Sequence, residues 1–456
     1  MNRSYFNSMN DPLLKTAVTF FGWRLAACLL WFAAMGGALQ PTAFGQSDVY
    51  LKLSTSERRQ VALAVAPLQA AGRAIARESE AAQRLIDVLA GDLRFSLYYR
   101  MVSAPATPRF GFRKGVIDYE AWRTIGAELV LVPLLSLAKG SAACTVAVHD
   151  IGQRREVYRQ ALPLAQGRSA AHAVCDEIIL RTVGERGIAR TRIAFCLKVG
   201  KHKELAVMDY DGQGAGRLTA FGSTVLSPDW SPDGGRLALM SFAGPQTVVY
   251  TLDLSARTSQ ELLRQPGVNV SPAWAPDGSA LALTMSRDGN AEIFTYDLRT
   301  KAQRRLTNSW AIDCSPAWSP SGREIAFVSD RAGSPQIYLM DADGGNIRRL
   351  IYEGSYNTSP AWSPKGDLIA FVSRVKGEFQ ICTISPTGDG HTQLTYEGDN
   401  EDPSWSPDGL HLAFSSDRTG RDEIWLMHWD GSEQRAVTST GGATMPAWSP
   451  FPAERK

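Results

Sequence analysis

The sequence predicts a mainly β protein: a six-bladed β-propeller preceded by a small α/β domain. The first observation is a tryptophan that recurs at intervals of 44, 44, 44, 43 and 43 residues, at Trp230, Trp274, Trp318, Trp362, Trp405 and Trp448. The second is the phrase around it, clearest as Pro-Ala-Trp-Ser-Pro, which a short apolar run follows in all but the last repeat. A period in the low forties with several short strands per repeat is typical of propeller blades.

The apolar runs indicate how the ring closes. Six runs centred on alanine begin at Ile193, Leu237, Leu281, Ile325, Ile369 and Leu412. The first run precedes the first tryptophan, and no run follows Trp448. The strand that ends at Trp448 should therefore complete the sheet that begins at Ile193. This pairing joins the two ends of the ring and removes an exposed edge, so we expect six blades of four strands.

The residues of each repeat explain why its strands and turns form where they do. The alanine-centred runs are apolar on both faces because a blade is packed between two neighbours. Prolines at positions 272, 316, 360 and 446 begin innermost strands, where the edge facing the channel tolerates a missing N–H. Ser406-Pro407-Asp408-Gly409 is a turn, and the amphipathic third strand at 336–341 ends in an Asp343-Gly344 turn.

Residues 1–45 have the pattern of an export signal peptide. Arg3, Lys15 and Arg24 are basic, and the apolar stretch 25–39 is short for a membrane span. Small residues precede Gly45, so we expect cleavage there, a chain that begins near Gln46 and no stable membrane insertion afterwards. The alternative is an uncleaved anchor.

Residues 46–187 are expected to form the α/β domain. Alternating or buried apolar patterns predict strands at 48–53, 60–66, 129–137, 144–150 and 156–164. An apolar stripe at three- and four-residue spacing predicts a helix over 78–99, and Ser169 is a candidate cap for a second helix that ends at Val183. A short linker, 184–187, should hold this domain close to the propeller domain, 188–456.

Composition gives little indication of chemistry. The chain has 48 basic and 46 acidic residues, and the expected signal peptide contains three basic residues and one acidic residue: Arg3, Lys15, Arg24 and Asp11. Cleavage would leave 45 of each, and this charge balance does not indicate a nucleic-acid partner. Five cysteines would remain, an odd number that favours buried free thiols. A Cys144–Cys175 bridge is the only pairing worth testing.

Enzymatic and metal sites were sought in the pattern. A Gly-x-Ser-x-Gly nucleophile motif does not occur, and the six histidines form no pair at metal-ligand spacing. Residues 341–346 resemble a calcium loop but lack its distal acidic ligand, which favours a plain turn. We therefore expect no cofactor, no metal and no catalytic residue. The alternative is a propeller lyase or hydrolase with its catalytic residues at the channel mouth, although the segments expected there are acidic or neutral.

The order of these elements resembles the TolB family. Residues 190–195, Arg-Thr-Arg-Ile-Ala-Phe, are similar to the family's entry into the propeller, and residues 337–344 to its third strand and turn. The resemblance implies a non-enzymatic, periplasmic and monomeric component of the Tol–Pal system. It implies binding of the lipoprotein Pal by the propeller and of TolA by the N-terminal segment. It also implies roles in outer-membrane integrity and in outer-membrane invagination during cell division.

Two sets of partner-binding residues follow. Loops before innermost strands and loops after second strands should emerge on one face, because successive strands run in opposite directions. The expected Pal-binding set at this mouth is Asn269, Asp313, Asn357, Glu401 and Asp402, with Arg331 and Arg418 nearby. For Asp330-Arg331 and Asp417-Arg418, stabilising the local turn is the alternative. The expected TolA-binding set is Asp48, Val49, Tyr50, Leu51, Lys52 and Leu53, whose alternative role is to complete the sheet of its own domain.

Overall fold

The computed structural model describes residues 59–71, 76–105, 107, 110–113, 116–138, 141–244 and 246–453. The expected signal peptide, the chain start near Gln46 and the strand at 48–53 lie outside these residues. Within the described part, no helix has the length and apolar character needed to cross a membrane.

The α/β domain is built on one mixed sheet with the strand order β3-β1-β6-β7-β8, in which β2 also pairs with β6. β1 is parallel to β3 and β6, whereas β6, β7 and β8 are antiparallel. A separate hairpin joins β4 to β5. The bounds are β1 (Val61–Val65), β2 (Gln69–Ala71), β3 (Tyr99–Val102), β4 (Phe112–Arg113), β5 (Val116–Ile117), β6 (Leu129–Ala138), β7 (Ser141–Asp150) and β8 (Arg155–Pro163).

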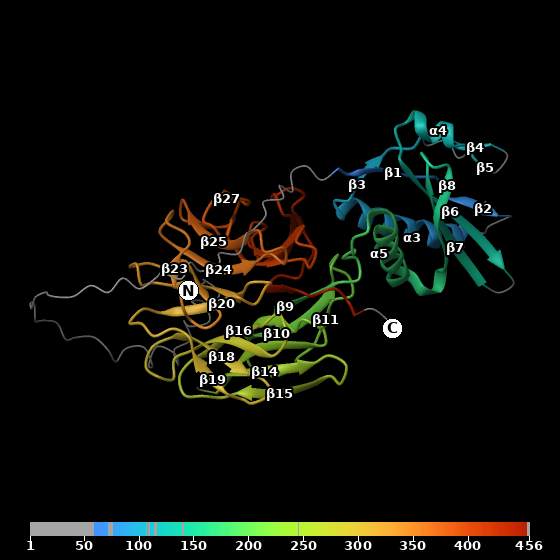
Figure 1. The fold of residues 1–456 in the computed structure, drawn as a ribbon. Coiled ribbons are helices and arrows are strands. Elements are labelled where there is room, and N and C mark those ends of the chain that lie inside the picture. Colours follow the sequence, from blue (N-terminus) through green and yellow to red (C-terminus); the bar gives the residue numbers. More distant parts are fainter. Residues whose placement is uncertain are drawn as a thin grey trace, which may run out of the picture. The chain divides into compact units, whose positions relative to one another are not determined.

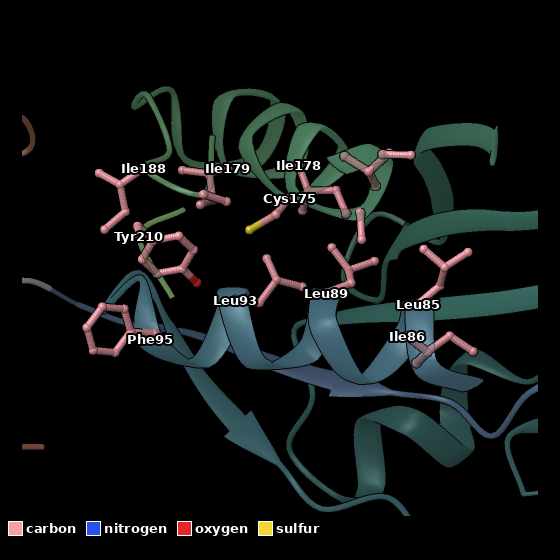
Figure 2. Packing of buried hydrophobic residues seen from close by; sticks show 14 of the residues in the cluster. Leu85, Ile86, Leu89, Leu93, Phe95, Cys175, Ile178, Ile179, Ile188 and Tyr210 are labelled. Atoms are coloured by element: carbon pink, nitrogen blue, oxygen red, sulfur yellow. The ribbon is translucent and has the colours of Figure 1, made fainter. Parts of the chain in front are cut away.

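Two helices pack together against one face of this sheet: α3 (Ala76–Phe95) and α5 (Gly167–Val183). Figure 2 shows the apolar stripe of α3, with Leu89 and Leu93 directed toward Cys175 and Ile178 of α5. The helix α4 (Tyr119–Thr124) contributes the fully buried Trp122 to a separate cluster with alternate residues of β1 and β6. The apolar strands β1 and β6 are therefore covered on both faces, as such strands require, whereas β8 is mostly exposed.

Helices α3 and α5 both differ in detail from expectation. α3 ends at Phe95, not at residue 99, because Leu97 adopts a φ of 63° and turns the chain into β3. Ser169 does not cap α5, because the helix begins at Gly167 and the Ser169 hydroxyl donates to the Gln166 carbonyl. The cysteines agree with expectation: Cys144 and Cys175 are free and buried in the core, with no bridge between them.

The propeller consists of six four-stranded antiparallel sheets, numbered here as blades 1 to 6 (Figure 1). From the innermost strand outward, blade 1 is β32 (Ala443–Trp448), β9 (Arg192–Val199), β10 (His202–Asp209) and β11 (Gly216–Arg217). Blade 2 is β12 (Val225–Trp230), β13 (Arg236–Ala243), β14 (Gln246–Asp253) and β15 (Thr258–Leu263). Blade 3 is β16 (Asn269–Trp274), β17 (Ala280–Met285), β18 (Glu292–Asp297) and β19 (Gln303–Arg305).

The other three blades repeat this arrangement. Blade 4 is β20 (Asp313–Trp318), β21 (Glu324–Ser329), β22 (Gln336–Asp341) and β23 (Arg348–Arg349). Blade 5 is β24 (Asn357–Trp362), β25 (Ile369–Val375), β26 (Glu378–Ile384) and β27 (Thr392–Gln393). Blade 6 is β28 (Asn400–Trp405), β29 (His411–Ser416), β30 (Glu423–His428) and β31 (Arg435–Ala436). The expected closure is confirmed, because β32 pairs with β9 and places Trp448 opposite Ile193.

The repeated tryptophan joins neighbouring blades. In three blades its indole Nε1 donates to the carbonyl of the residue before the tryptophan of the preceding blade: Trp230 to Ala447 at 2.9 Å, Trp318 to Ala273 at 3.2 Å and Trp405 to Ala361 at 3.0 Å. A buried indole usually has such an acceptor, but the buried Nε1 of Trp274 and that of Trp362 have none. The repeat is therefore a consequence of blade-to-blade packing.

Every innermost strand contains a bulge, which the sequence analysis did not predict. The residue before the strand proline has a φ of 52° to 56°, and the register with the second strand shifts across it. These residues are Ser227, Ser271, Ser315, Ser359, Asp402 and Met445. The proline thus lies in the bulge, where the ladder has no need of its missing N–H.

The α/β domain contacts one end of the blades. The Phe95 carbonyl lies 2.6 Å from Nε2 of His411, at the start of β29, and the Arg435 guanidinium lies 4.2 Å from the Phe95 ring. The Tyr210 hydroxyl donates to Oδ1 of the buried Asp92 at 2.5 Å. These contacts come from the end of the propeller where the second strands begin, opposite to the loops described next.

Candidate partner-binding face

The loops at the other end of the blades form the expected mouth of the channel. In blade 3, Asn269 begins the innermost strand and pairs with Met285, which ends the second strand. The loop that enters each innermost strand and the loop that leaves each second strand therefore emerge together, as expected. We call this end of the propeller the mouth face.

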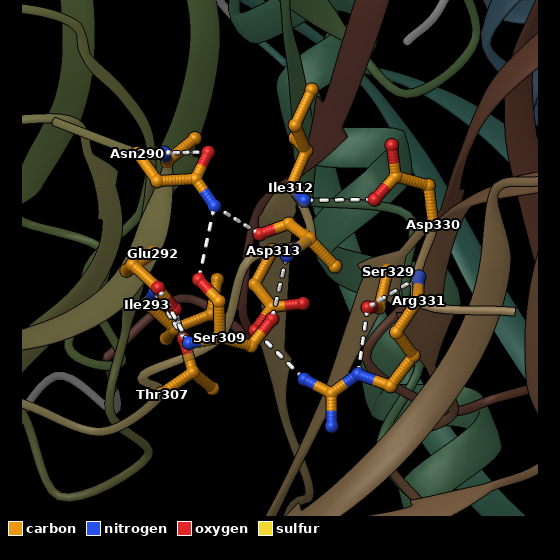
Figure 3. Close-up of polar contacts among 12 residues, drawn as sticks. Asn290, Glu292, Ile293, Thr307, Ser309, Ile312, Asp313, Ser329, Asp330 and Arg331 are labelled. Atoms are coloured by element: carbon orange, nitrogen blue, oxygen red, sulfur yellow. Dashed lines mark hydrogen bonds and ion pairs between the residues drawn. The ribbon is translucent and has the colours of Figure 1, made fainter. Parts of the chain in front are cut away.

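A buried carboxylate holds one mouth-face loop. Glu292 begins β18 and is fully buried. Its Oε2 accepts from the Thr307 hydroxyl at 2.6 Å, and its Oε1 accepts from the Ser309 N–H at 2.8 Å (Figure 3). Arg305 also donates to Oε1, at 2.8 Å. The Thr307 oxygen in turn accepts from the Ile293 N–H at 2.9 Å. Because an unpaired buried carboxylate is costly, this network fixes the loop that leads into blade 4.

The same clasp recurs in three other blades, where an acid or amide within the first three residues of the third strand accepts from the hydroxyl of a threonine after the fourth strand. The hydroxyl-to-oxygen distances are 2.5 Å for Thr219–Glu204, 2.8 Å for Thr395–Gln380 and 2.5 Å for Thr438–Glu423. Burial acts to raise the pKa of Glu204, but donors from Thr219, Gly222 and Phe221 outweigh it and hold that pKa below its usual value. The sequence analysis missed these residues, although a polar residue recurs at the start of each apolar third strand.

Three residues of the expected Pal-binding set are fully buried: Asn269, Asp313 and Asn357. Asn269 donates to the Gln265 carbonyl at 2.8 Å, and Asn357 donates to Oε1 of Gln336 at 2.8 Å. Burial raises the pKa of Asp313 despite the opposing effects of Ser329 and Arg331. With no exposed surface, these side chains support the mouth-face loops from beneath and do not present themselves to a partner.

Arg331 and Arg418 make contacts within their own blades, in line with the alternative role of stabilising the local turn. Arg331 donates to Oδ2 of Asp313 at 2.8 Å and to the Ser329 hydroxyl at 2.9 Å (Figure 3). Arg418 repeats this in blade 6, donating to Oδ1 of Asn400 at 2.6 Å. Asn400 is the counterpart of Asn357, and the sequence analysis missed it in favour of the two acidic residues that follow.

Glu401 and Asp402 are half-buried, next to the junction of blades 6 and 1. Asp402 occupies the bulge position that is serine in four other blades, with a φ of 56°. Burial raises the pKa of Asp402 to about 6, and the positive charge of Lys203 opposes this effect. Lys203 comes from β10, and its Nζ donates to the Thr444 hydroxyl at 2.8 Å. Arg331 and Arg418 are also half-buried, so these two acids are the partly accessible acidic residues of the expected set.

One cluster among the described residues has donor atoms close enough to hold a metal ion: Asp92, His172 and Asp211. Nδ1 of His172 lies 2.7 Å from Oδ2 of Asp92, and Arg168 contacts both His172 and Asp211. Burial acts to lower the pKa of His172, but its bond to Asp92 and the charges of Asp92 and Asp211 raise it overall. Because a guanidinium and an imidazole already balance the two carboxyls, the cluster is better described as an ion-pair network than as a metal site.

Comparison with known proteins identifies the family. The TolB beta propeller domain matches residues 180–452, and the TolB amino-terminal domain matches residues 49–157. The chain belongs to the TolB family. A crystal structure of TolB from Acinetobacter baumannii is similar with a TM-score of 0.73 and 27% identity, over 86% of this chain and 97% of that one.

Curated relatives carry the name "Tol-Pal system protein TolB". That of Chromobacterium violaceum is 33% identical over 188 residues, 41% of this chain and 44% of the relative. That of Desulfosudis oleivorans is 37% identical over 241 residues, 51% of this chain and 54% of the relative. The chain spans about half the length of the curated relatives it matches.

Proposed function

We propose that this chain is a non-enzymatic, periplasmic component of the Tol–Pal system. In this role it binds Pal through the mouth face and TolA through its N-terminal segment. The system would maintain outer-membrane integrity and draw the outer membrane inward during cell division. The main support is membership of the TolB family, whose relatives are named for the Tol–Pal system and not for a reaction.

The mouth face supports the Pal assignment because its loops are preorganised. Clasps such as Glu292–Thr307 hold the loops without a partner, so binding would not have to order them. Glu401 and Asp402 offer partly accessible negative charge on that face.

The test of this assignment is the affinity for purified Pal. The variant combines Glu401→Lys with Asp402→Ser, because serine occupies the same bulge position in four other blades. We expect at least a tenfold loss of affinity with little change in melting temperature. Asp389→Lys, at an exposed turn on the opposite end of blade 5, is the matched control. Unchanged Pal affinity in the double variant would move the interface away from these acids.

The TolA assignment concerns residues 48–53, which lie outside the described residues. Deleting residues 46–53 should abolish TolA binding while the propeller stays folded, because the strands of the six blades all lie within residues 192–448. If the segment only completes the sheet of its own domain, the deletion should lower that domain's melting temperature and leave the TolA affinity of the folded fraction normal.

A further inference from the structure

Three exposed aromatic side chains lie at successive blade junctions on the mouth face. Among the described residues, Trp310, Tyr352 and Tyr396 are the exposed aromatic residues, with 79%, 75% and 70% of their surface accessible. Each lies in the loop between the fourth strand of one blade and the innermost strand of the next. We propose that this aromatic sector is the principal contact surface for the propeller's protein partner. The inference rests on the proposed function, since it refines where that partner binds.

Tryptophan and tyrosine are enriched among the residues that dominate binding energy at protein interfaces. Here they lie at three consecutive junctions, between blades 3 and 4, 4 and 5, and 5 and 6. At the other three junctions, the position of Tyr352 and Tyr396 in the loop is occupied by Ala220, Gln265 and Ser439. The aromatic sector thus covers half of the ring, and a partner would sit off the channel axis over blades 3 to 6.

The loops that carry these aromatics are held by buried groups. The loop of Trp310 is bound by Glu292 through the Ser309 N–H. In the next two junctions, buried Gln336 and Gln380 donate to the Gly354 carbonyl at 3.4 Å and the Gly398 carbonyl at 2.9 Å. Rigid loops keep large apolar rings in water without letting them fold back. Binding there would gain the burial of the rings at a low ordering cost.

The tyrosine hydroxyl and ring contacts reinforce this rigidity. The Tyr396 hydroxyl donates to the Gln393 carbonyl at 2.9 Å. The Arg349 guanidinium lies 5.0 Å from the centre of the Tyr352 ring, in cation–π contact. Both rings are therefore held in place while one face of each remains accessible to a partner.

The charges beside the aromatics indicate what kind of surface fits them. Glu353 and Glu397 directly follow the two tyrosines and are exposed. The Glu353 carboxylate also pairs with Nδ1 of His391 at 2.7 Å. Glu401 lies on the same face. An apolar centre with acidic residues at its edge fits a folded protein with an apolar patch bordered by lysine or arginine, and Pal is the partner that the proposed function assigns.

The experiment measures the affinity of purified Pal for the unaltered chain and for variants of the sector. We expect each of Trp310→Ala, Tyr352→Ala and Tyr396→Ala to weaken binding about tenfold and the triple variant at least 100-fold, as truncated interface anchors do. Melting temperatures should stay unchanged because the rings are exposed. Two controls should bind normally: Gln265→Ala, at a junction outside the sector, and Leu180→Ala, an exposed apolar residue on α5.

The possible outcomes separate the two proposals. If the unaltered chain binds Pal and the triple variant binds equally well, the aromatic sector is not the contact surface, while the proposed function stands. If the unaltered chain fails to bind Pal, the proposed function is overturned, and the assignment of the sector to that partner with it. If the triple variant keeps Pal but loses binding to soluble peptidoglycan fragments, the sector is a glycan-stacking surface and the protein assignment is wrong.

Discussion

Ring closure can be tested at Trp448, the last of the repeated tryptophans. Its side chain is 6% exposed, and its Nε1 donates to the Thr191 hydroxyl at 2.8 Å, so it joins the end of the chain to the start of the propeller. Trp448→Ala removes a buried indole and should cost about 3–5 kcal/mol. Trp448→Phe keeps most of the apolar volume and loses the hydrogen bond, so it should cost about 1–2 kcal/mol.

Guanidinium denaturation, followed by far-UV circular dichroism, measures both variants. With a slope of about 4 kcal/mol/M, the alanine variant should lower the midpoint by about 1 M. Truncation before Ala443 removes the whole of β32 and should lower the midpoint further, because β9 then has an unpaired inner edge. A truncated chain whose main transition keeps the original midpoint and slope would refute closure through β32.

Three further predictions concern buried groups. Burial raises the pKa of the Cys144 thiol to about 11 and also raises that of Cys175. Both thiols should therefore react with a thiol reagent only after the chain unfolds, and rapid labelling of the folded chain would contradict this. Burial lowers the pKa of His428 to about 4. Between pH 6.5 and 4, His428 is therefore protonated in the unfolded chain and remains neutral in the folded chain. Stability should fall across that window by up to about 3 kcal/mol, and His428→Gln should flatten the dependence in urea titrations. Tyr210→Phe removes a donor to the buried Asp92 and should cost about 1–3 kcal/mol in the same assay; an unchanged free energy of unfolding would show that this bond contributes nothing.

The expected binding residues show how far sequence reasoning reached at the mouth face. The alternation of strand direction correctly brought Asn269, Asp313 and Asn357 to this face. Their burial could not be predicted, because the groups that pack against them come from other strands of the fold, such as Gln336 of β22 against Asn357 of β24. The aromatic sector was missed for the opposite reason: an aromatic residue in an unaligned sequence is more often part of a core than exposed.

By itself, the sequence determined the number of blades, their four-strand plan and the pairing of the last strand with the first. These properties depend on local features, a tryptophan, a proline turn and an apolar run, whose spacing counts the repeats. It also determined the apolar stripe of α3, a local periodicity. The tertiary structure decided which polar residues are buried as clasps, which cysteines stay unpaired and which aromatics face water. Each of those outcomes depends on what neighbouring blades and domains place against a residue, and that information is distributed over the whole folded chain.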